Sequence, residues 1–205
     1  MSLFITFEGG EGSGKSVQTR TLYRKLCHLD IPAILIHEPG STPIGERLTR
    51  LLKWSRSANI SPLAELMLFN ASRAQLVDKV IKPALNVGQI VICDRYTDST
   101  IAYQGYGRRL DIGTIKNTND IATGALKPDL TVLLDIPVDE GFARKRGQEQ
   151  DRFEQEANAF HQRVRKGYLK LADEEPQRWL VVNACLPKEK IKKIIWEKVS
   201  NLLPK

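Results

Sequence analysis

Five short runs of apolar residues, rich in β-branched side chains, alternate along this chain with segments of helical periodicity. Runs that are apolar throughout are typical of strands buried on both faces, and strands separated by helices need crossover connections. The sequence therefore predicts an α/β fold with a five-stranded parallel sheet flanked by helices. The expected strands are LFITF (3–7), PAILIH (32–37), QIVICD (89–94), LTVLLDI (130–136) and WLVV (179–182).

The segments between these runs predict helices near 15–29, 43–53, 61–86, 112–125, 138–146 and 153–173, and an amphipathic helix within 186–205. Ser61 and Pro62, followed by Glu65, form a helix-start signal, and Pro83 should kink or end the same helix. Because no repeat, low-complexity stretch or linker is visible, we expect a single domain over residues 1–205.

The net charge of +7 at first suggests a nucleic-acid partner. Residues 186–205 supply +4 of that charge, from six lysines against two glutamates, and we expect these lysines to form the solvated face of the amphipathic helix. We therefore expect no nucleic-acid site there. No run of eighteen apolar residues and no signal-peptide pattern is visible, so no membrane partner and a cytoplasmic location are predicted. Three widely spaced cysteines predict small buried residues rather than a metal or disulfide site.

The first strand leads into a glycine-rich segment that fits the phosphate-binding pattern G-x-x-x-x-G-K-[ST] in the required strand–loop–helix context. Its backbone N–H groups and the helix N-terminus would bind the phosphates of ATP. Lys15 would place a charge at the transferred phosphate, and the Ser16 hydroxyl could ligate Mg²⁺. The segment comprises Gly9, Gly10, Glu11, Gly12, Ser13, Gly14, Lys15 and Ser16.

A phosphate-binding loop does not identify the acceptor, so a small-molecule kinase and a nucleotide-hydrolysing switch or motor both remain open. The guanine-recognition motif of GTPases is missing, since residues 117–120 (NTND) lack its lysine. Asp94 ends the third strand beside Arg95, where a carboxylate and a guanidinium could serve metal and phosphate together. Phe69 and Arg73 lie four residues apart on one expected helix, a pair suited to stack on a base and bond its carbonyl.

Five segments together resemble bacterial thymidylate kinases: FEGGEGSGKS, HEPGSTPIGE, LMLFNASRAQLV, DRYTDSTIAYQGYGR and DRFEQE. The resemblance extends to about residue 183. It implies the P-loop nucleoside monophosphate kinase fold with a short lid near 144–152. It also implies Mg²⁺-dependent transfer of a phosphoryl group from ATP to dTMP in a homodimer.

The resemblance further implies roles for individual residues. Phe69 would stack on thymine, Arg73 would bond its exocyclic oxygen, and Thr100 and Gln104 would complete the base contacts. Tyr103 would lie where a ribose 2′-hydroxyl would otherwise be. The remaining substrate-binding residues would be Glu11 at the deoxyribose 3′-hydroxyl, Arg95 at the acceptor phosphate, and Glu38.

The lid should supply the catalytic arginine, because this chain has Gly12 where one branch of the family has an arginine. Arg152, within DRFEQE, is favoured over Arg146, and Arg144 is expected against adenine. Two positions depart from the family pattern, since His37 and Thr49 replace arginines near the acceptor phosphate. Two alternatives stay open: a kinase with a shifted acceptor such as dUMP or a modified deoxynucleotide, and a P-loop NTPase acting on nucleic acid.

Overall fold

The computed structural model describes residues 2–55, 59–147 and 149–203. Within them lies a five-stranded parallel sheet with strand order β2-β3-β1-β4-β5, as the apolar runs predict. Each strand begins and ends within one residue of its expected bounds. The strands are β1 (Leu3–Glu8), β2 (Ala33–His37), β3 (Ile90–Asp94), β4 (Leu130–Asp135) and β5 (Trp179–Asn183).

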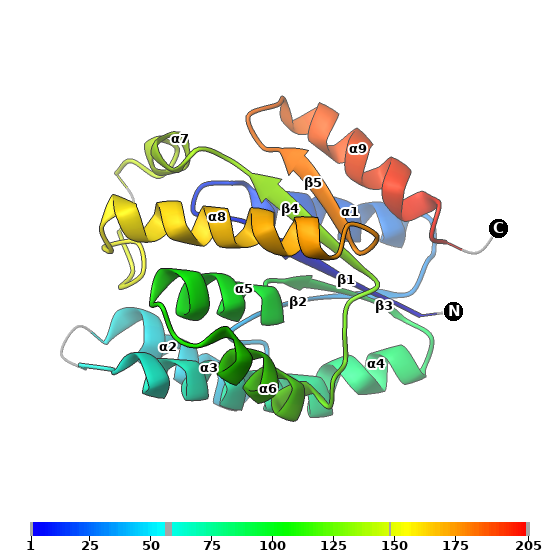
Figure 1. Cartoon of the computed structure of the whole chain (residues 1–205). Coiled ribbons are helices and arrows are strands. Elements are labelled where there is room, and N and C mark those ends of the chain that lie inside the picture. Colours follow the sequence, from blue (N-terminus) through cyan, green and yellow to red (C-terminus); the bar gives the residue numbers. More distant parts are fainter. Residues whose placement is uncertain (1, 56–58, 148, 204–205) are drawn as a thin grey trace.

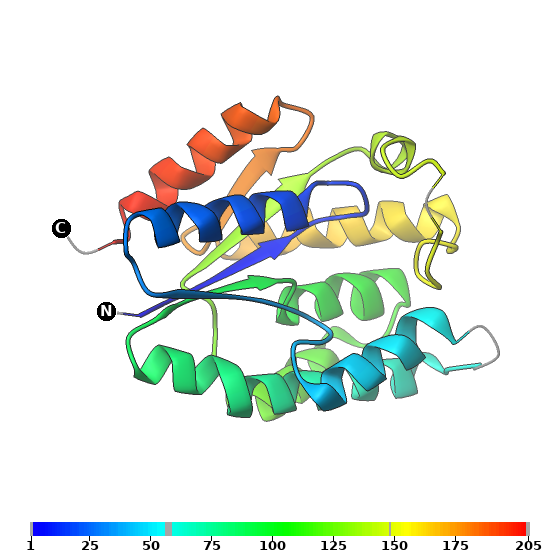
Figure 2. The ribbon, with the colours of Figure 1, turned by 180° about the vertical axis from the view of Figure 1, so that it is seen from behind.

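Helices cover both faces of the sheet (Figure 1). Seen from behind in Figure 2, α1 and α9 lie on one face, and α8 lies on the opposite one. The α-helices are α1 (Lys15–His28), α2 (Pro43–Trp54), α3 (Pro62–Leu76), α4 (Lys82–Asn86), α5 (Thr97–Thr100), α6 (Ile112–Thr123), α7 (Val138–Ala143), α8 (Asn158–Glu174) and α9 (Lys188–Ser200). Two π-helical segments, η1 (Val77–Ile81) and η2 (Ile101–Gly107), continue α3 and α5.

Alternation along the central strands explains why both faces need helices. Ile5 and Ile92 belong to a core with α1 and α9, whereas Phe4 and Val91 pack against α3, η1 and α4. A third cluster joins α8, η2 and α6 to strands β4 and β5. The central strands are thus largely apolar because side chains on both of their faces pack against helices.

The helix-start signal at Ser61 is confirmed. The Ser61 side chain accepts a hydrogen bond from the Ala64 backbone N–H, and Pro62 occupies the first helical position. Pro83, however, neither ends nor interrupts the helical segment 62–86. The Lys82 N–H, one residue before Pro83, donates to the Val77 carbonyl five residues earlier. This π-helical turn changes the spacing of the backbone hydrogen bonds next to Pro83, which has no N–H to donate.

One expected helix begins later than predicted, and one helical segment was not predicted at all. The helix expected from 153 begins at Asn158, because the Asp151 carboxylate caps the backbone N–H groups of Phe153 and Glu154 in a separate turn. Residues 97–107 are helical, although their sequence TDSTIAYQGYG lacks a clear apolar period.

The expectation for the cysteines holds at one position only. Cys93 is buried in the sheet, whereas Cys27 on α1 and Cys185 after β5 are exposed. No helix among the described residues has the length and apolar character required to cross a bilayer.

Candidate active site

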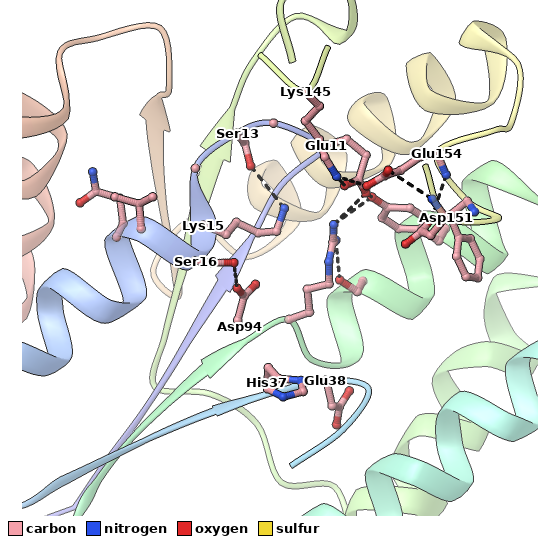
Figure 3. A pocket seen from close by; sticks show the side chains of 18 of the residues that line it. Glu11, Ser13, Lys15, Ser16, His37, Glu38, Asp94, Lys145, Asp151 and Glu154 are labelled. Carbon is pink, nitrogen blue, oxygen red and sulfur yellow. Dashed lines mark hydrogen bonds and ion pairs between the residues drawn. The ribbon is translucent and has the colours of Figure 1, made fainter. Parts of the chain in front are cut away.

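A cavity of about 1100 Å³ opens at the carboxyl ends of the central strands. Figure 3 shows that the loop after β1, the end of β3 and residues of the expected lid surround it. This edge is where parallel α/β sheets bind ligands, because connections on either side of a strand diverge there. Predicted site residues that line the cavity are Glu11, Gly12, Ser13, Gly14, Lys15, Ser16, Glu38, Phe69, Arg73, Asp94, Arg95, Thr100, Tyr103, Gln104 and Arg144.

The glycine-rich loop is shaped as its motif predicts. Gly14, at φ 89°, precedes α1, and Gly12 adopts φ 67°. A Cβ on Gly12 would lie 2.0 Å from the Gly141 carbonyl oxygen, so α7 leaves no room for a side chain at this position. Among the described residues no side chain caps the N-terminus of α1, so the N–H groups of its first turn are free to bind an anion.

Lys15 lies across this loop in a buried position. Its Nζ donates to the carbonyl oxygens of Gly9 and Gly10, both at 2.9 Å. Burial lowers the pKa of Lys15 to about 8, with Arg95 adding to the fall and the nearby carboxylates opposing it. The ammonium is thus held beside the anion cradle, bonded to neutral carbonyls that phosphate oxygens can replace.

Ser16 and Asp94 both line the cavity and contact each other. The Ser16 Oγ donates to the Asp94 Oδ2 at 2.6 Å. A hydroxyl and a carboxylate oxygen side by side suit Mg²⁺, which takes few protein ligands and completes its shell with water and phosphate oxygens. No larger cluster of His, Cys, Asp or Glu suited to a metal occurs within residues 2–55, 59–147 and 149–203.

Arg95 is half-buried and is held by contacts on several sides. Its backbone is left-handed, at φ 74°, and its Nη1 donates to the hydroxyl oxygens of Ser99 and Tyr168, both at 3.2 Å. Its Nη2 donates to the Glu11 Oε1 at 3.0 Å and to the Tyr103 hydroxyl oxygen at 3.1 Å. These contacts aim the guanidinium at the P-loop end of the cavity.

Glu11 is a charged acceptor at the same place. Burial raises its pKa, but Arg95 and Lys15, together with the hydroxyl of Tyr103, outweigh burial and hold the pKa well below its usual range. Tyr103 donates to the Glu11 Oε1 at 2.7 Å. Glu11 can therefore accept a hydrogen bond from a substrate hydroxyl across the neutral pH range.

Another part of the cavity wall contains Phe69, whose ring centroid lies 5.7 Å from that of Phe153. Arg73 is 1% exposed, and each of its five N–H donors already has a protein acceptor. The acceptors are the Glu38 Oε2 at 2.8 Å, the Asn70 Oδ1 at 3.2 Å, the Asn119 Oδ1 at 2.7 Å, the Tyr96 carbonyl at 3.4 Å and the Thr100 Oγ1 at 2.6 Å. A bond from Arg73 to a base would have to replace or share one of these contacts.

Glu38 is the buried carboxylate that pairs with Arg73. One carboxylate oxygen pairs with the guanidinium, whereas Oε1 is buried without a hydrogen-bond partner among the described residues. Burial raises the pKa of Glu38, and the Arg73 charge opposes that rise. The carboxyl therefore depends on one ion pair.

The expected lid is only partly turned toward the cavity. Arg144 lines it and donates to the Ala184 carbonyl at 3.0 Å. Arg146 is exposed and Arg152 is half-buried, and neither belongs to the cavity wall described. Arg152 donates instead to the Glu65 Oε2 at 2.6 Å and to the Leu52 carbonyl at 2.9 Å. Gln148, within the expected lid, lies outside the described residues.

Lys145 is a further cation of the expected lid and lies near a P-loop carboxylate. Its Nζ contacts the Glu154 carboxylate and lies 3.9 Å from the Glu11 Oε2 (Figure 3). Sequence reasoning missed this lysine because it weighed only the arginines of RKRGQEQDR. It also missed the far wall of the cavity, formed by Ala184, Leu186, Pro187, Lys188 and Ile191 after β5. Their position beyond the end of a parallel strand was the available signal.

The two positions that depart from the family pattern both line the cavity. The His37 Nδ1 donates to the Pro39 carbonyl at 3.2 Å, and its Nε2 lies 3.4 Å from the Glu46 Oε1. Thr49 donates from its hydroxyl to the Gly45 carbonyl at 2.8 Å. Both side chains are thus engaged by α2 and its N-terminal loop.

Comparison with known proteins agrees with this geometry. The family model for thymidylate kinase matches residues 7–195. A thymidylate kinase of Dehalococcoides mccartyi is 57% identical over 203 residues, covering 99% of this chain and 98% of the relative. One from Symbiobacterium thermophilum is 43% identical over 205 residues, covering 100% and 96% of the two chains.

A solved structure leads to the same family. The crystal structure of thymidylate kinase from Ehrlichia chaffeensis superimposes with a TM-score of 0.77 at 34% identity, over 98% of this chain and 99% of the other. The fold is accordingly that of the P-loop nucleoside monophosphate kinases. Because the family model spans residues 7–195 and relatives with up to 57% identity cover nearly the whole chain, this chain belongs to the thymidylate kinase family.

Proposed function

We propose that this chain transfers a phosphoryl group from ATP to dTMP, giving ADP and dTDP for dTTP synthesis. The observation that carries the proposal is one cavity that joins the P-loop to a pocket with Phe69, Thr100 and Gln104. The relatives are named for thymidylate, and both ends of the cavity suit that reaction. A donor triphosphate at the P-loop and an acceptor beside Phe69 would meet between Lys15 and Arg95.

Phosphoryl transfer depends mainly on positioning and on positive charge around the transferred group. Lys15 would leave its two carbonyl acceptors to bind phosphate oxygens, and Arg95 would hold the acceptor phosphate. Glu11 would accept from the deoxyribose 3′-hydroxyl, with the Tyr103 ring against the sugar. Ser16 and Asp94 fit Mg²⁺, which would supply charge neutralisation at the donor phosphates.

The lid would complete the site around ATP. Arg144 would lie against adenine, and its hydrogen bonds to the Gly12 carbonyl at 3.4 Å and the Ala184 carbonyl at 3.0 Å support this role. Arg152 and Arg146 would have to move from their present places to reach phosphate. Lys145 needs no such movement, and we propose it as a further lid cation at the P-loop.

We also propose that two copies of the chain pair through α2 and α3. These helices pack against each other and leave large apolar side chains exposed at helical spacing. Ile44 and Leu51 lie seven residues apart on α2, and Leu63 and Met67 lie four apart on α3. A second copy presenting the same helices would cover both pairs.

A coupled assay of ADP release tests the proposed reaction. The acceptors are dTMP, dUMP, dGMP and CMP, with ATP and Mg²⁺ present throughout, beside a control without acceptor. We expect dTMP to give the highest kcat/KM, with dUMP behind it, because a methyl group in an apolar pocket is worth ~1–3 kcal/mol. Equal or better turnover of dUMP would favour the shifted acceptor. ATP hydrolysis that responds to DNA or RNA and ignores dTMP would overturn the kinase proposal.

A further inference from the structure

A buried carboxylate, Glu65, lies behind Gln104 in the wall of the cavity. It is 0% exposed in the first turn of α3 and does not belong to the cavity wall described. Its Oε1 accepts from the Gln104 Nε2 at 2.7 Å and from the Arg108 Nε at 3.3 Å. Its Oε2 accepts from the Arg152 Nη2 at 2.6 Å and from the Arg108 Nη2 at 3.3 Å. Two guanidiniums thus compensate the buried charge.

This contact fixes which end of the Gln104 amide faces the protein. A carboxylate only accepts hydrogen bonds, so the amide nitrogen must face Glu65 and the amide oxygen must point elsewhere. Gln104 lines the cavity, and among the described residues the contact with Glu65 is the one hydrogen bond given for its side-chain amide. The Gln104 Oε1 therefore offers a hydrogen-bond acceptor to a ligand in the cavity.

Thr100 supplies the complementary group. Its Oγ1 accepts from the Arg73 Nη2 at 2.6 Å, so one lone pair is used. The described contacts give its own hydroxyl proton no acceptor, and Thr100 also lines the cavity. A donor and an acceptor therefore face the cavity four residues apart on one helical segment.

The pattern matches one class of pyrimidine. Thymine and uracil present a carbonyl oxygen at C4 next to an N3–H, which pair with a donor and an acceptor. Cytosine presents an amino group at C4 next to an unprotonated N3, so it would face Thr100 and Gln104 with both polarities reversed. Buried polar groups left unpaired in this way discriminate strongly between ligands.

We propose that Glu65 is a positioning residue that fixes Gln104 as an acceptor and so selects pyrimidines with an N3–H over cytosine. The proposal rests on the proposed function, since it assumes that the acceptor base lies beside Gln104. Glu65 acts through Gln104 and does not touch the base.

The test compares kcat/KM for dTMP and dCMP in wild-type protein and Glu65→Gln. The new amide can donate to the Gln104 Oε1, so Gln104 is free to turn its nitrogen to the cavity. We expect the dTMP:dCMP ratio of kcat/KM to fall about tenfold or more. Glu65→Asp keeps the charge but withdraws the carboxylate by one methylene. We expect it to lower the ratio less, and it serves as the test if Glu65→Gln does not fold.

Asp98→Asn is the matched control. Asp98 is equally buried and pairs with Arg178 at 2.7 Å, but it does not contact Gln104. A purely structural effect of losing a buried carboxylate would therefore appear in both variants. We expect Asp98→Asn to leave the ratio within about twofold of the wild type.

The outcomes separate the two proposals. Wild-type protein that favours dTMP, with folded Glu65 variants that keep the wild-type ratio, would overturn the role of Glu65 alone. Wild-type protein that transfers no phosphate to dTMP would overturn the proposed function and this inference with it. An equal fall in the Asp98→Asn control would also overturn the inference, because the effect would not depend on Gln104.

Discussion

At the scale of single residues, Arg73 has structural partners that its predicted task does not account for. The predicted task was a hydrogen bond to the base, whereas the structure surrounds the guanidinium with five protein acceptors. Among these, Glu38 is the consequential one, because its other oxygen has no partner. Replacement of Arg73 therefore affects folding before it affects binding.

We expect Arg73→Ala to lower the free energy of unfolding by about 3–5 kcal/mol, because it leaves the Glu38 charge buried and unpaired. Urea unfolding of the ligand-free protein measures this loss. In the Glu38→Gln background the same substitution should cost clearly less, since the uncompensated charge is gone. Equal losses in both backgrounds would show that the ion pair is not the source of the effect.

Glu8 gives a pH dependence of stability. It accepts from the Tyr96 N–H at 2.8 Å, the Ser99 Oγ at 2.6 Å and the Tyr168 hydroxyl at 2.8 Å. Burial, with the Asp98 carboxylate, nevertheless raises the pKa of Glu8 from 4.5 to about 7. Between these two pH values the folded state binds more protons at Glu8 than the unfolded state does. The contribution of Glu8 to stability is therefore largest below pH 4.5 and falls until about pH 7.

We expect Glu8→Gln to abolish this fall, which amounts to about 3 kcal/mol in the full window. The difference in unfolding free energy between variant and wild type should shift in favour of the variant between pH 5 and pH 8. Glu11, with its lowered pKa, has the opposite pH dependence in both proteins, so it cancels from the difference. Urea unfolding at the two pH values gives the result, and a constant difference would show that Glu8 does not titrate in this window.

At the scale of elements, residues between α7 and α8 contact two other parts of the fold, the P-loop and α3. Lys145 meets the P-loop through Glu11, and Arg152 meets α3 through Glu65. The turn capped by Asp151 lies between them. The two cations therefore serve different neighbours in this structure.

We expect Lys145→Ala to lower kcat about tenfold or more with less than about twofold change in the KM for dTMP, because it removes a charge from the P-loop side. Steady-state kinetics with varied dTMP measures both constants. Lys166→Ala, at an exposed position of α8, is the control. If Lys145→Ala keeps its kcat while Arg152→Ala loses it, the lid acts through Arg152 alone.

At the scale of the whole molecule, the proposed ligand site and the proposed dimer surface lie on different parts of the fold. The cavity occupies the carboxyl ends of the strands, and α2 and α3 form part of the layer below the sheet in Figure 1. Pairing through α2 and α3 would bury their exposed apolar side chains.

We expect sedimentation to show a dimer for the wild type and a monomer for Met67→Glu, because a charge at the centre of an apolar interface is desolvated without a partner. Val87→Glu changes an even more exposed apolar residue, at the end of α4, and should leave the dimer intact. Dimers that persist in Met67→Glu would place the interface on another surface.

Much of the fold was predictable because its information is local. Apolar runs such as QIVICD and the P-loop glycines have few conformations open to them, so strand bounds and loop shape followed from neighbouring residues. The helix at 97–107 was not predictable in this way. Its segment is held by tertiary partners, with Ser99 bonded to Glu8 and Gln104 to Glu65.

The sequence by itself determined the parallel sheet and the P-loop, since periodicity and spacing encode both, and the family resemblance added part of the set of side chains that line the cavity. Only the tertiary structure decided how those side chains are paired. Glu65 meets Gln104 and Arg152, which are 39 and 87 residues away, and Arg73 meets Asn119 across 46 residues. Contacts between residues so far apart cannot be predicted from the spacing of residues along the chain. They arise because burial leaves each polar group to find a partner from whichever element packs beside it.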